Sequence, residues 1–289
     1  MRLLFLGLPL AALALTRAGH EVVLAGLCRD AAPGTRRIRR VLGDRVVVKP
    51  ALDRAFVARA KAAAPELLVS WFWTNKIPVS LVKAAPLGGV GFHPSLLPRW
   101  RGPDPCFAAI DADDAESGVT AHRIAAEYDT GALLGARTVP IDPRWDAWAL
   151  ARALDGPSLR LMVETVAALG AGRAVETAQD EARVTLAEAP TEEMLELDFK
   201  RDAASIVRRV RAAAPYPGAW TFLGDEAVVV TRAEVAADVP KVLEPGEAAV
   251  VRGRVVVRAG DTGVALLRGR RVDDEAEAWC DASALAALL

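Results

Sequence analysis

The chain contains few of the residues that build disulfide frameworks or metal centres. Its 289 residues include three histidines and three cysteines, and Cys28, Cys106 and Cys280 are isolated, without a CxxC spacing. Isolated cysteines favour a reducing compartment and argue against a disulfide scaffold or a structural zinc site. With so few histidines, a histidine-rich metal site is also disfavoured, and we expect no bound metal.

The chain also lacks a strong net charge and a long apolar run. Its formal net charge is −1, so no global basic field points to a nucleic-acid partner, although a local basic patch is not excluded. No run reaches the ~18 apolar residues of a membrane span. The composition, 52% hydrophobic and 25% charged, is typical of a soluble globular protein of one or two domains. We therefore expect a cytoplasmic protein with neither a membrane partner nor an obligate protein partner.

The first segment of the sequence has two interpretations. MRLLFLGLPLAALALTRAG has a positive start, an apolar stretch and small residues, which is the outline of a secretory signal. We favour a buried strand at Arg2–Leu6, followed by a turn and a helix that Gly19 ends. A second strand, Glu21–Gly26, follows at once and needs a partner, which supports the structural interpretation.

The first half of the chain alternates short apolar runs with helical segments. The predicted strands are Arg2–Leu6, Glu21–Gly26, Val46–Val48, Leu67–Trp73 and the run that ends at His93, and the predicted helices include Asp53–Ala64 and Val79–Ala84. This alternation predicts an α/β fold with a doubly wound, mostly parallel sheet. Ligands of such sheets bind at the carboxyl ends of the strands, where His93 falls. No GxGxxG follows the first strand, so dinucleotide binding is not supported.

The pattern changes in the second half. We predict a helix at Pro105–Ile110, strands at Ser117–Ile124 and Gly135–Ile141, a helix over Asp146–Leu169 with an interruption at Gly156-Pro157, and a helix at Asp202–Ala213. Five short strands follow: Trp220–Leu223, Ala227–Arg232, Ala248–Val251, Val255–Arg258 and Val264–Leu267. Short strands with glycine-bearing turns predict a small β-barrel or sandwich. We therefore predict a first domain at 1–180, a linker at 181–203 and a second domain at 204–289.

A small basic cluster, RRIRR, runs from Arg36 to Arg40 after Pro33-Gly34. One interpretation is a solvated loop or helix face. The other is a contact with phosphate, either of an RNA or of a phosphorylated substrate.

Two segments carry the residues suited to chemistry. GVGFHPSLLPRWRG, from Gly89 to Gly102, delivers His93 to the end of a strand and continues as an irregular loop rich in proline and glycine. EYDTG, from Glu127 to Gly131, places Asp129 on a loop. A histidine at a strand end is a common place for a catalytic base, and a carboxylate beside it can orient an imidazole. The alternative is a capping interaction without catalysis.

These segments resemble the hallmark of the formyltransferases that use 10-formyltetrahydrofolate. In that family a histidine precedes SLLP, an RG pair follows and an Asp-Thr-Gly loop lies downstream, in the order and at the spacing found here. The segments Gln179–Glu181, Ile206–Arg211 and Ala214–Leu223 resemble the linker and C-terminal barrel of methionyl-tRNA formyltransferases. The resemblance implies a Rossmann-like N-terminal domain and an OB-like C-terminal domain.

The resemblance also implies a reaction and a set of site residues. The protein is expected to transfer a formyl group from 10-formyltetrahydrofolate to a primary amine, with His93 as base and Asp129 orienting it. The residues expected around the folate are Trp73, Ser95, Leu96, Leu97, Pro98, Glu127 and Tyr128. The residues expected to contact the acceptor are Arg99, Arg101, Arg208 and Arg211. The aromatics Trp71, Phe72 and Trp73 are alternatively core residues, and we interpret His122 as a histidine that packs in a strand.

The sequence departs from the family pattern at one position. Family members carry Asn-x-His, and the amide of that asparagine donates to the developing oxyanion, whereas this chain has Gly91. Losing one such donor costs on the order of 10²–10³ in rate. Three interpretations remain: a water or a neighbouring donor such as Asn75 replaces the amide, His93 as imidazolium serves the oxyanion, or efficient formyl transfer has been lost.

The acceptor is therefore left with alternatives. The amino group of initiator methionyl-tRNA, methionyl-tRNA(fMet), is the leading choice because the C-terminal domain resembles the one that such enzymes use against tRNA. Against it stands the short segment Cys28–Gly43, where the tRNA enzymes carry a longer loop. The alternatives are a formyltransferase for a small-molecule amine such as an amino sugar, and a folate- or RNA-binding relative with impaired catalysis.

Overall fold

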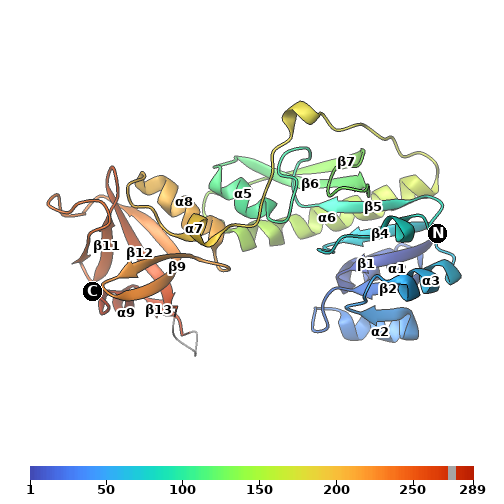
Figure 1. Ribbon diagram of the computed structural model, residues 1–289, viewed down its shortest axis with the longest axis horizontal. Helices are drawn as coiled ribbons and strands as arrows, with labels where there is room; N and C mark the ends of the chain where they lie inside the picture. Colours follow the sequence, from blue (N-terminus) through green and yellow to red (C-terminus); the bar gives the residue numbers. More distant parts are fainter. Residues whose placement is uncertain (273–277) are drawn as a thin grey trace. The chain divides into compact units, whose positions relative to one another are not determined.

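The computed structural model describes residues 1–272 and 278–289, and the chain forms two compact units (Figure 1). The first unit comprises Met1–Pro105, Ser117–Pro140 and Ala153–Ala187. The second comprises Cys106–Glu116, Ile141–Arg152 and Glu188–Leu289. The predicted C-terminal domain, 204–289, includes residues 273–277, which lie outside the described residues.

The first unit is built on a seven-stranded sheet with the order β3-β2-β1-β4-β5-β6-β7. Its strands are β1 (Arg2–Gly7), β2 (Glu21–Leu27), β3 (Val46–Val48), β4 (Leu67–Trp71), β5 (Gly89–His93), β6 (Glu116–Arg123) and β7 (Leu133–Pro140). The pairs from β3 to β5 are parallel, and β5 and β6 are antiparallel. The predicted mostly parallel, Rossmann-like sheet is confirmed.

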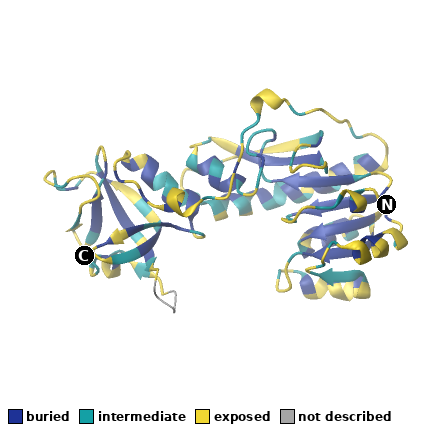
Figure 2. Ribbon diagram, viewed as in Figure 1, coloured by how far each residue is buried: buried dark blue, intermediate teal, exposed yellow. Residues whose placement is uncertain are grey.

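The strands at the centre of this sheet are buried on both faces, as their apolar composition predicts (Figure 2). The helices of this part of the chain are α1 (Pro9–Arg17), α2 (Thr35–Leu42), α3 (Arg54–Ala62), α4 (Val79–Val82), α5 (Pro105–Asp111) and α6 (Ala147–Gly170), with a short 3₁₀ turn, η1, at Gly43–Arg45. α3 begins where the sequence places it, because Asp53 caps it: its Oδ1 accepts a hydrogen bond of 2.9 Å from the Phe56 N–H.

Helix α6 corrects one prediction. The interruption expected at Gly156-Pro157 is not observed, and Pro157 lies inside a continuous helix. Proline removes one backbone donor, but the apolar face continues on both sides of it, with Leu154 and Leu161 buried. Ser158, next to the proline, accepts a 2.7 Å hydrogen bond from the indole N–H of Trp71. Tertiary packing therefore overrides the local preference for a break.

The second unit contains an antiparallel six-stranded sheet, with β13 pairing β12 beside the path β10-β11-β12-β9-β8. Its strands are β8 (Ala219–Leu223), β9 (Glu226–Ala236), β10 (Ala248–Val251), β11 (Arg254–Arg258), β12 (Gly263–Arg271) and β13 (Cys280–Asp281). The remaining helical elements are η2 (Glu181–Arg183), α7 (Glu192–Leu195), α8 (Ala203–Ala213) and α9 (Ala282–Ala286). The small β domain predicted from the sequence is present, and β9 and β12 are longer than expected.

None of the helices within residues 1–272 and 278–289 combines the length and the apolar character needed to span a bilayer.

Candidate active site

His93 lies at the carboxyl end of β5, the edge at which ligands of such sheets bind. Its side chain is buried, with 7% of its surface exposed. The ring Nε2 lies 2.7 Å from the backbone oxygen of Trp100. Because a carbonyl oxygen only accepts, Nε2 carries a proton. The other nitrogen, Nδ1, faces Asp129 Oδ2 at 3.5 Å.

Asp129 is held in place by its neighbours. Its backbone adopts a left-handed conformation, with φ of 55°. Its Oδ2 accepts a 3.0 Å hydrogen bond from the Gly102 N–H. The side-chain amide of Gln179 donates to the backbone oxygens of Asp129 and Gly131, at 2.6 and 2.8 Å. A side chain at Gly131 would place its Cβ 1.8 Å from the backbone oxygen of Arg123, so this turn requires glycine.

The loop after His93 is fixed by hydrogen bonds from within the sheet. Ser95 is fully buried, and its hydroxyl donates to the Arg99 oxygen at 2.6 Å. Thr120 on β6 donates to the Ser95 oxygen at 2.7 Å and accepts from the Leu97 N–H at 3.0 Å. The peptide between Leu97 and Pro98 is cis. Four of the residues that the sequence assigned to the folate, Ser95, Leu96, Leu97 and Pro98, thus belong to a loop beside His93 that these hydrogen bonds hold.

Arg101 is committed to contacts inside the first unit. It is 7% exposed and donates to the Gln179 Oε1 at 2.7 and 3.0 Å and to the two carboxylate oxygens of Glu181. These hydrogen bonds hold the pKa of Glu181 below its ordinary value. The structure therefore gives Arg101, expected to contact the acceptor, a second role: it positions Gln179, which in turn holds the Asp129 loop.

His122 on β6 also lies at Asp129, which the sequence alone did not indicate. It is paired across the sheet with Gly91. Its Nδ1–H donates to the Arg123 oxygen at 2.9 Å, and its Nε2 lies 3.6 Å from Asp129 Oδ1. Burial lowers the pKa of His122, and the Asp129 carboxylate opposes that effect. The sequence did carry a signal: Gly91 stands where the family motif has asparagine, and His122 stands in the next predicted strand.

Four predicted residues, Glu127, Tyr128, Asn75 and Trp73, lie in or near exposed loops. The Lys76 ammonium lies 3.5 Å from Glu127 Oε2 and 5.9 Å from the centre of the Tyr128 ring. Asn75 is exposed in the loop between β4 and α4. Trp73 packs partly against the core cluster around Leu6, and its indole N–H is buried without a hydrogen-bond partner in the described part of the chain.

The remaining arginines assigned to the acceptor also have protein contacts. Arg208 lies 3.7 Å from Asp113, and Arg211 donates to the backbone oxygens of Pro143 and Trp145 at 2.5 and 3.2 Å. Their neighbour Arg209 pairs with Asp111 at 2.6 Å. The guanidinium of Arg99 lies over the Trp100 ring, 4.2 Å from its centre. The contacts of Arg208, Arg209 and Arg211 are with residues of the second unit. The contact of Arg99 is within the loop that follows β5.

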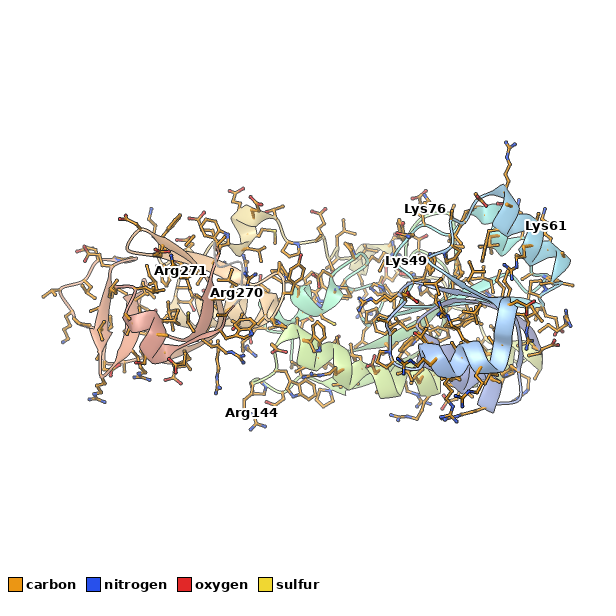
Figure 3. The ribbon with its side chains drawn as sticks, turned by 90° about the horizontal axis from the view of Figure 1, so that it is seen from below. Lys49, Lys61, Lys76, Arg144, Arg270 and Arg271 are labelled. Atoms are coloured by element: carbon orange, nitrogen blue, oxygen red, sulfur yellow. The ribbon has the colours of Figure 1, made fainter. Side chains whose placement is uncertain are left out.

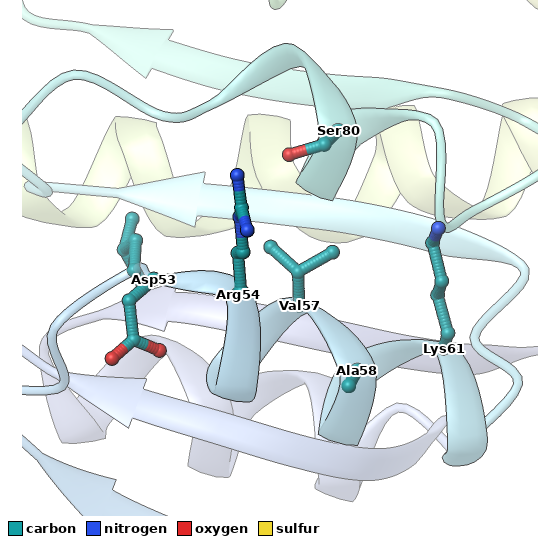
Figure 4. A pocket seen from close by; sticks show the side chains of 7 residues that line it. Asp53, Arg54, Val57, Ala58, Lys61 and Ser80 are labelled. Atoms are coloured by element: carbon teal, nitrogen blue, oxygen red, sulfur yellow. The ribbon is translucent and has the colours of Figure 1, made fainter.

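A separate concavity of about 550 Å³ lies over α3 and α4 (Figure 4). Its lining residues are Leu52, Asp53, Arg54, Val57, Ala58, Lys61 and Ser80. It includes none of the residues around His93. Within residues 1–272 and 278–289, no cluster of histidine, cysteine and carboxylate side chains is arranged to hold a metal ion.

The arrangement around Asp129 can accept and hold a proton. One N–H of each histidine donates to a backbone oxygen. The lone pair on the other nitrogen of each neutral ring therefore faces the Asp129 carboxylate, Oδ2 for His93 and Oδ1 for His122. A proton on either nitrogen turns a contact between two acceptors into an ion pair. A buried carboxylate is stabilised by such a partner. The site is therefore suited to proton transfer.

The chain matches known families and proteins along most of its length. A family model described as "Formyl transferase" matches residues 31–166, and one described as "Formyl transferase, C-terminal domain" matches residues 190–286. Methionyl-tRNA formyltransferase of Acidobacterium capsulatum is 34% identical over 91% of this chain and 89% of its own. Methionyl-tRNA formyltransferase of Anaeromyxobacter dehalogenans is 36% identical over 92% of this chain and 90% of its own.

Solved structures show the same fold. HypX from Aquifex aeolicus, in complex with tetrahydrofolic acid, has a TM-score of 0.71 and 21% identity over 98% of this chain, which spans 46% of the HypX chain. WlaRD, a sugar 3N-formyl transferase, has a TM-score of 0.69 and 12% identity over 95% of this chain and 98% of its own. On the two family matches and the identity to its relatives, the chain belongs to the formyltransferase family of enzymes.

Proposed function

We propose that the protein transfers a formyl group from 10-formyltetrahydrofolate to the amino group of methionyl-tRNA(fMet). The observation that carries this proposal is the identity, 34% over 91% and 36% over 92% of this chain, to two relatives named methionyl-tRNA formyltransferase. The pair of His93 and Asp129, at the ligand-binding edge of the sheet, supports it independently.

The bonds made and broken define what the site must do. The amine nitrogen forms a bond to the formyl carbon, and the electron pair of the carbonyl moves to its oxygen. When this oxyanion collapses, the bond from the formyl carbon to N10 of the folate breaks. One proton leaves the amine and one is taken up by the departing nitrogen, so no net proton is consumed.

His93 is placed to take the proton of the amine. Its Nε2–H is already held by the Trp100 oxygen, so the lone pair of the neutral ring is on Nδ1. The 3.5 Å distance from Nδ1 to Asp129 is longer than an ordinary hydrogen bond, which agrees with an unprotonated Nδ1. Once Nδ1 takes the proton, the Trp100 oxygen and the Asp129 carboxylate stabilise the two N–H groups of the imidazolium.

The folate is assigned to the same edge. HypX, whose fold matches 98% of this chain, was solved with tetrahydrofolic acid, and this supports a folate donor for the present chain. Leu96, Leu97 and Pro98 belong to the loop beside His93, and Tyr128 is 53% exposed next to Asp129. The buried and unpartnered indole N–H of Trp73, among the described residues, is a donor suited to a polar atom of the folate ring.

Helix α2 is the candidate contact for the tRNA. Arg36, Arg37, Arg39 and Arg40 are exposed on it, whereas Thr35, Ile38 and Leu42 are buried against the unit. Arg39 pairs with Asp30 at 3.1 Å. Other cations, including the six labelled in Figure 3 (Lys49, Lys61, Lys76, Arg144, Arg270 and Arg271), are spread over several elements. A dense patch of arginines is the type of surface that neutralises phosphates.

A small-molecule amine is the second candidate acceptor. The supporting observation is the similarity in fold to a sugar 3N-formyl transferase along nearly the whole of both chains. The internal contacts of Arg101, Arg208 and Arg211 also reduce the number of cations at hand for a polyanion.

One assay tests the proposal and separates the two acceptors. The purified protein is given 10-formyltetrahydrofolate with either methionyl-tRNA(fMet) or an amino sugar, and N-formyl product is measured. We expect transfer to the tRNA in the wild type and none in His93→Ala. If only the amino sugar is formylated, the acceptor is a small-molecule amine and not the tRNA. If His93→Ala retains activity, His93 is not the base.

A further inference from the structure

The reaction needs a hydrogen-bond donor for the oxyanion, and Gly91 has no side chain to supply one. His93 and Gly91 are two residues apart on β5, so both face the same side of the sheet. Asp129 is also on this side but its carboxylate only accepts hydrogen bonds. With His93 acting as base, a side-chain donor would have to come from another neighbour of His93.

The ring of His122 fills the space above Gly91. The two residues are direct partners in the antiparallel pairing of β5 and β6. A Cβ built at Gly91 would lie 2.9 Å from His122 Nε2 and 3.1 Å from Cε1. Any larger side chain at position 91 would have to displace this buried ring. The ring of His122 therefore occupies space that is open because position 91 has no side chain.

We propose that His122 supplies, through Nε2, the hydrogen bond to the oxyanion that a side chain at position 91 would otherwise supply. This inference rests on the proposed formyl transfer and adds a residue to it. Nε2 occupies the position of the missing side chain and lies on the side of the sheet that carries His93 and Asp129. It makes His122, rather than the exposed Asn75, the substitute for the missing amide.

His122 donates from Nε2 in its imidazolium form, since Nδ1–H is already held by the Arg123 oxygen. The groups that face the ring are Asp129, which favours the cation, and His93 and Arg101, which oppose it. With His93 neutral and acting as base, the charge of the His122 imidazolium balances the Asp129 carboxylate, which is 15% exposed. At 3.6 Å from Oδ1 the Nε2–H is not held in a hydrogen bond by that carboxylate, so it is available to the oxyanion. Burial lowers the pKa of His122, so the donor form is lost as pH rises, whereas His93 and the attacking amine must both be unprotonated and are lost as pH falls. The rate of transfer is therefore expected to pass through a maximum with pH, and the loss of the His122 donor contributes to its alkaline side.

Four variants test the pair: His122→Ala, His122→Gln, Gly91→Asn and the double variant Gly91→Asn/His122→Ala. Single-turnover transfer and tetrahydrofolate binding are measured for each, over a series of pH values. We expect the rate of His122→Ala to fall about 10²–10³-fold with unchanged folate affinity. His122→Gln keeps a donor that does not titrate, so it should retain more activity than His122→Ala and lose the alkaline fall in rate, while the acid side set by His93 and the amine remains.

The double variant gives the sharpest readout. Gly91→Asn alone should be slow and less stable to heat, because the amide and the ring compete for one space. Removing the ring in the double variant should restore the melting temperature and raise the rate at least 10-fold above His122→Ala. A rate within 3-fold of wild type for His122→Ala would overturn the inference, as would a double variant no faster than His122→Ala. A wild type that transfers no formyl group to either acceptor would instead overturn the proposed function.

Discussion

The side-chain amide of Gln179 donates a 2.6 Å hydrogen bond to the backbone oxygen of Asp129, fifty residues earlier in the chain. The same amide holds Gly131, and its oxygen accepts from Arg101. The loop that carries the carboxylate is thus fixed by a residue that lies just before the short turn η2. Catalysis depends on placement at the level of about 1 Å, so this hydrogen bond has a measurable effect.

Replacing Gln179 with alanine is expected to lower kcat by about 10- to 100-fold, because Asp129 is no longer fixed beside His93 and His122. The KM for the folate should change less, since the hydrogen bonds of Gln179 are made to the protein and not to the ligand. Steady-state kinetics with the preferred acceptor provide the measurement.

Arg137→Gln is the matched control for Gln179→Ala. Arg137 pairs with Glu164 through side chains that are about half exposed, and such pairs contribute ~0–1 kcal/mol to stability. It should leave kcat unchanged. A Gln179→Ala enzyme with wild-type kcat would show that the Asp129 loop keeps its position without this side chain.

The arginines of α2 should determine how tRNA binding depends on salt. Replacing Arg36, Arg37 and Arg40 with glutamine removes three exposed charges without touching the buried face of the helix. If these charges neutralise phosphates, the slope of log K against log salt falls by about 0.7–0.9 for each arginine replaced, or by about two to three in total. Filter binding or fluorescence titration over a series of salt concentrations measures this slope.

Arg144→Gln serves as the comparison for the α2 variant. Arg144 is also exposed but pairs with Asp142 at 2.7 Å, and its replacement should leave the slope unchanged. An unaltered slope in the α2 variant would show that the tRNA binds to another surface of the protein.

The N-cap of α8 should make the free energy of unfolding of the second unit depend on pH in the acid range. The Ser205 N–H donates to Asp202 at 2.8 Å, and this hydrogen bond holds the pKa of Asp202 below its ordinary value. Because the pKa is lower in the folded than in the unfolded state, the stabilisation is present above the unfolded value and disappears as pH falls through the folded one.

Chemical unfolding of Asp202→Ala and Asp202→Asn over a series of pH values tests this cap. Asp202→Ala should be less stable than wild type near neutral pH, and the difference should shrink in acid. Asp202→Asn keeps an oxygen acceptor and cannot titrate, so it should be more stable than Asp202→Ala at every pH. A constant gap between wild type and Asp202→Ala down to about pH 2 would contradict the assignment.

The sequence was sufficient for the elements whose signal is local. Val46–Val48 and Ala248–Val251 form strands at the predicted residues because each is a short apolar run between turns. Helix α8 is found where it was predicted because Asp202 caps it. The family motif also identified the segment that carries His93 and the one that carries Asp129, and the structure brings the two side chains together.

What the sequence could not supply depends on contacts between distant residues. The position of His122 opposite Gly91 follows from the register of β5 and β6, which no local pattern sets. The hydrogen bond from Gln179 to Asp129 closes a loop of fifty residues. The continuity of α6 through Pro157 likewise rests on packing against the sheet, including the hydrogen bond from Trp71 to Ser158.

The pairing of Gly91 with His122 also constrains how this site can have evolved. An asparagine at position 91 would displace the histidine ring from its present place, and removal of the ring from the present chain leaves the oxyanion without its proposed donor. If His122 supplies the donor, neither single replacement preserves the site, and a change from one arrangement to the other is expected to require both. Homologues should accordingly fall into two groups, in which the residues at these two positions change together.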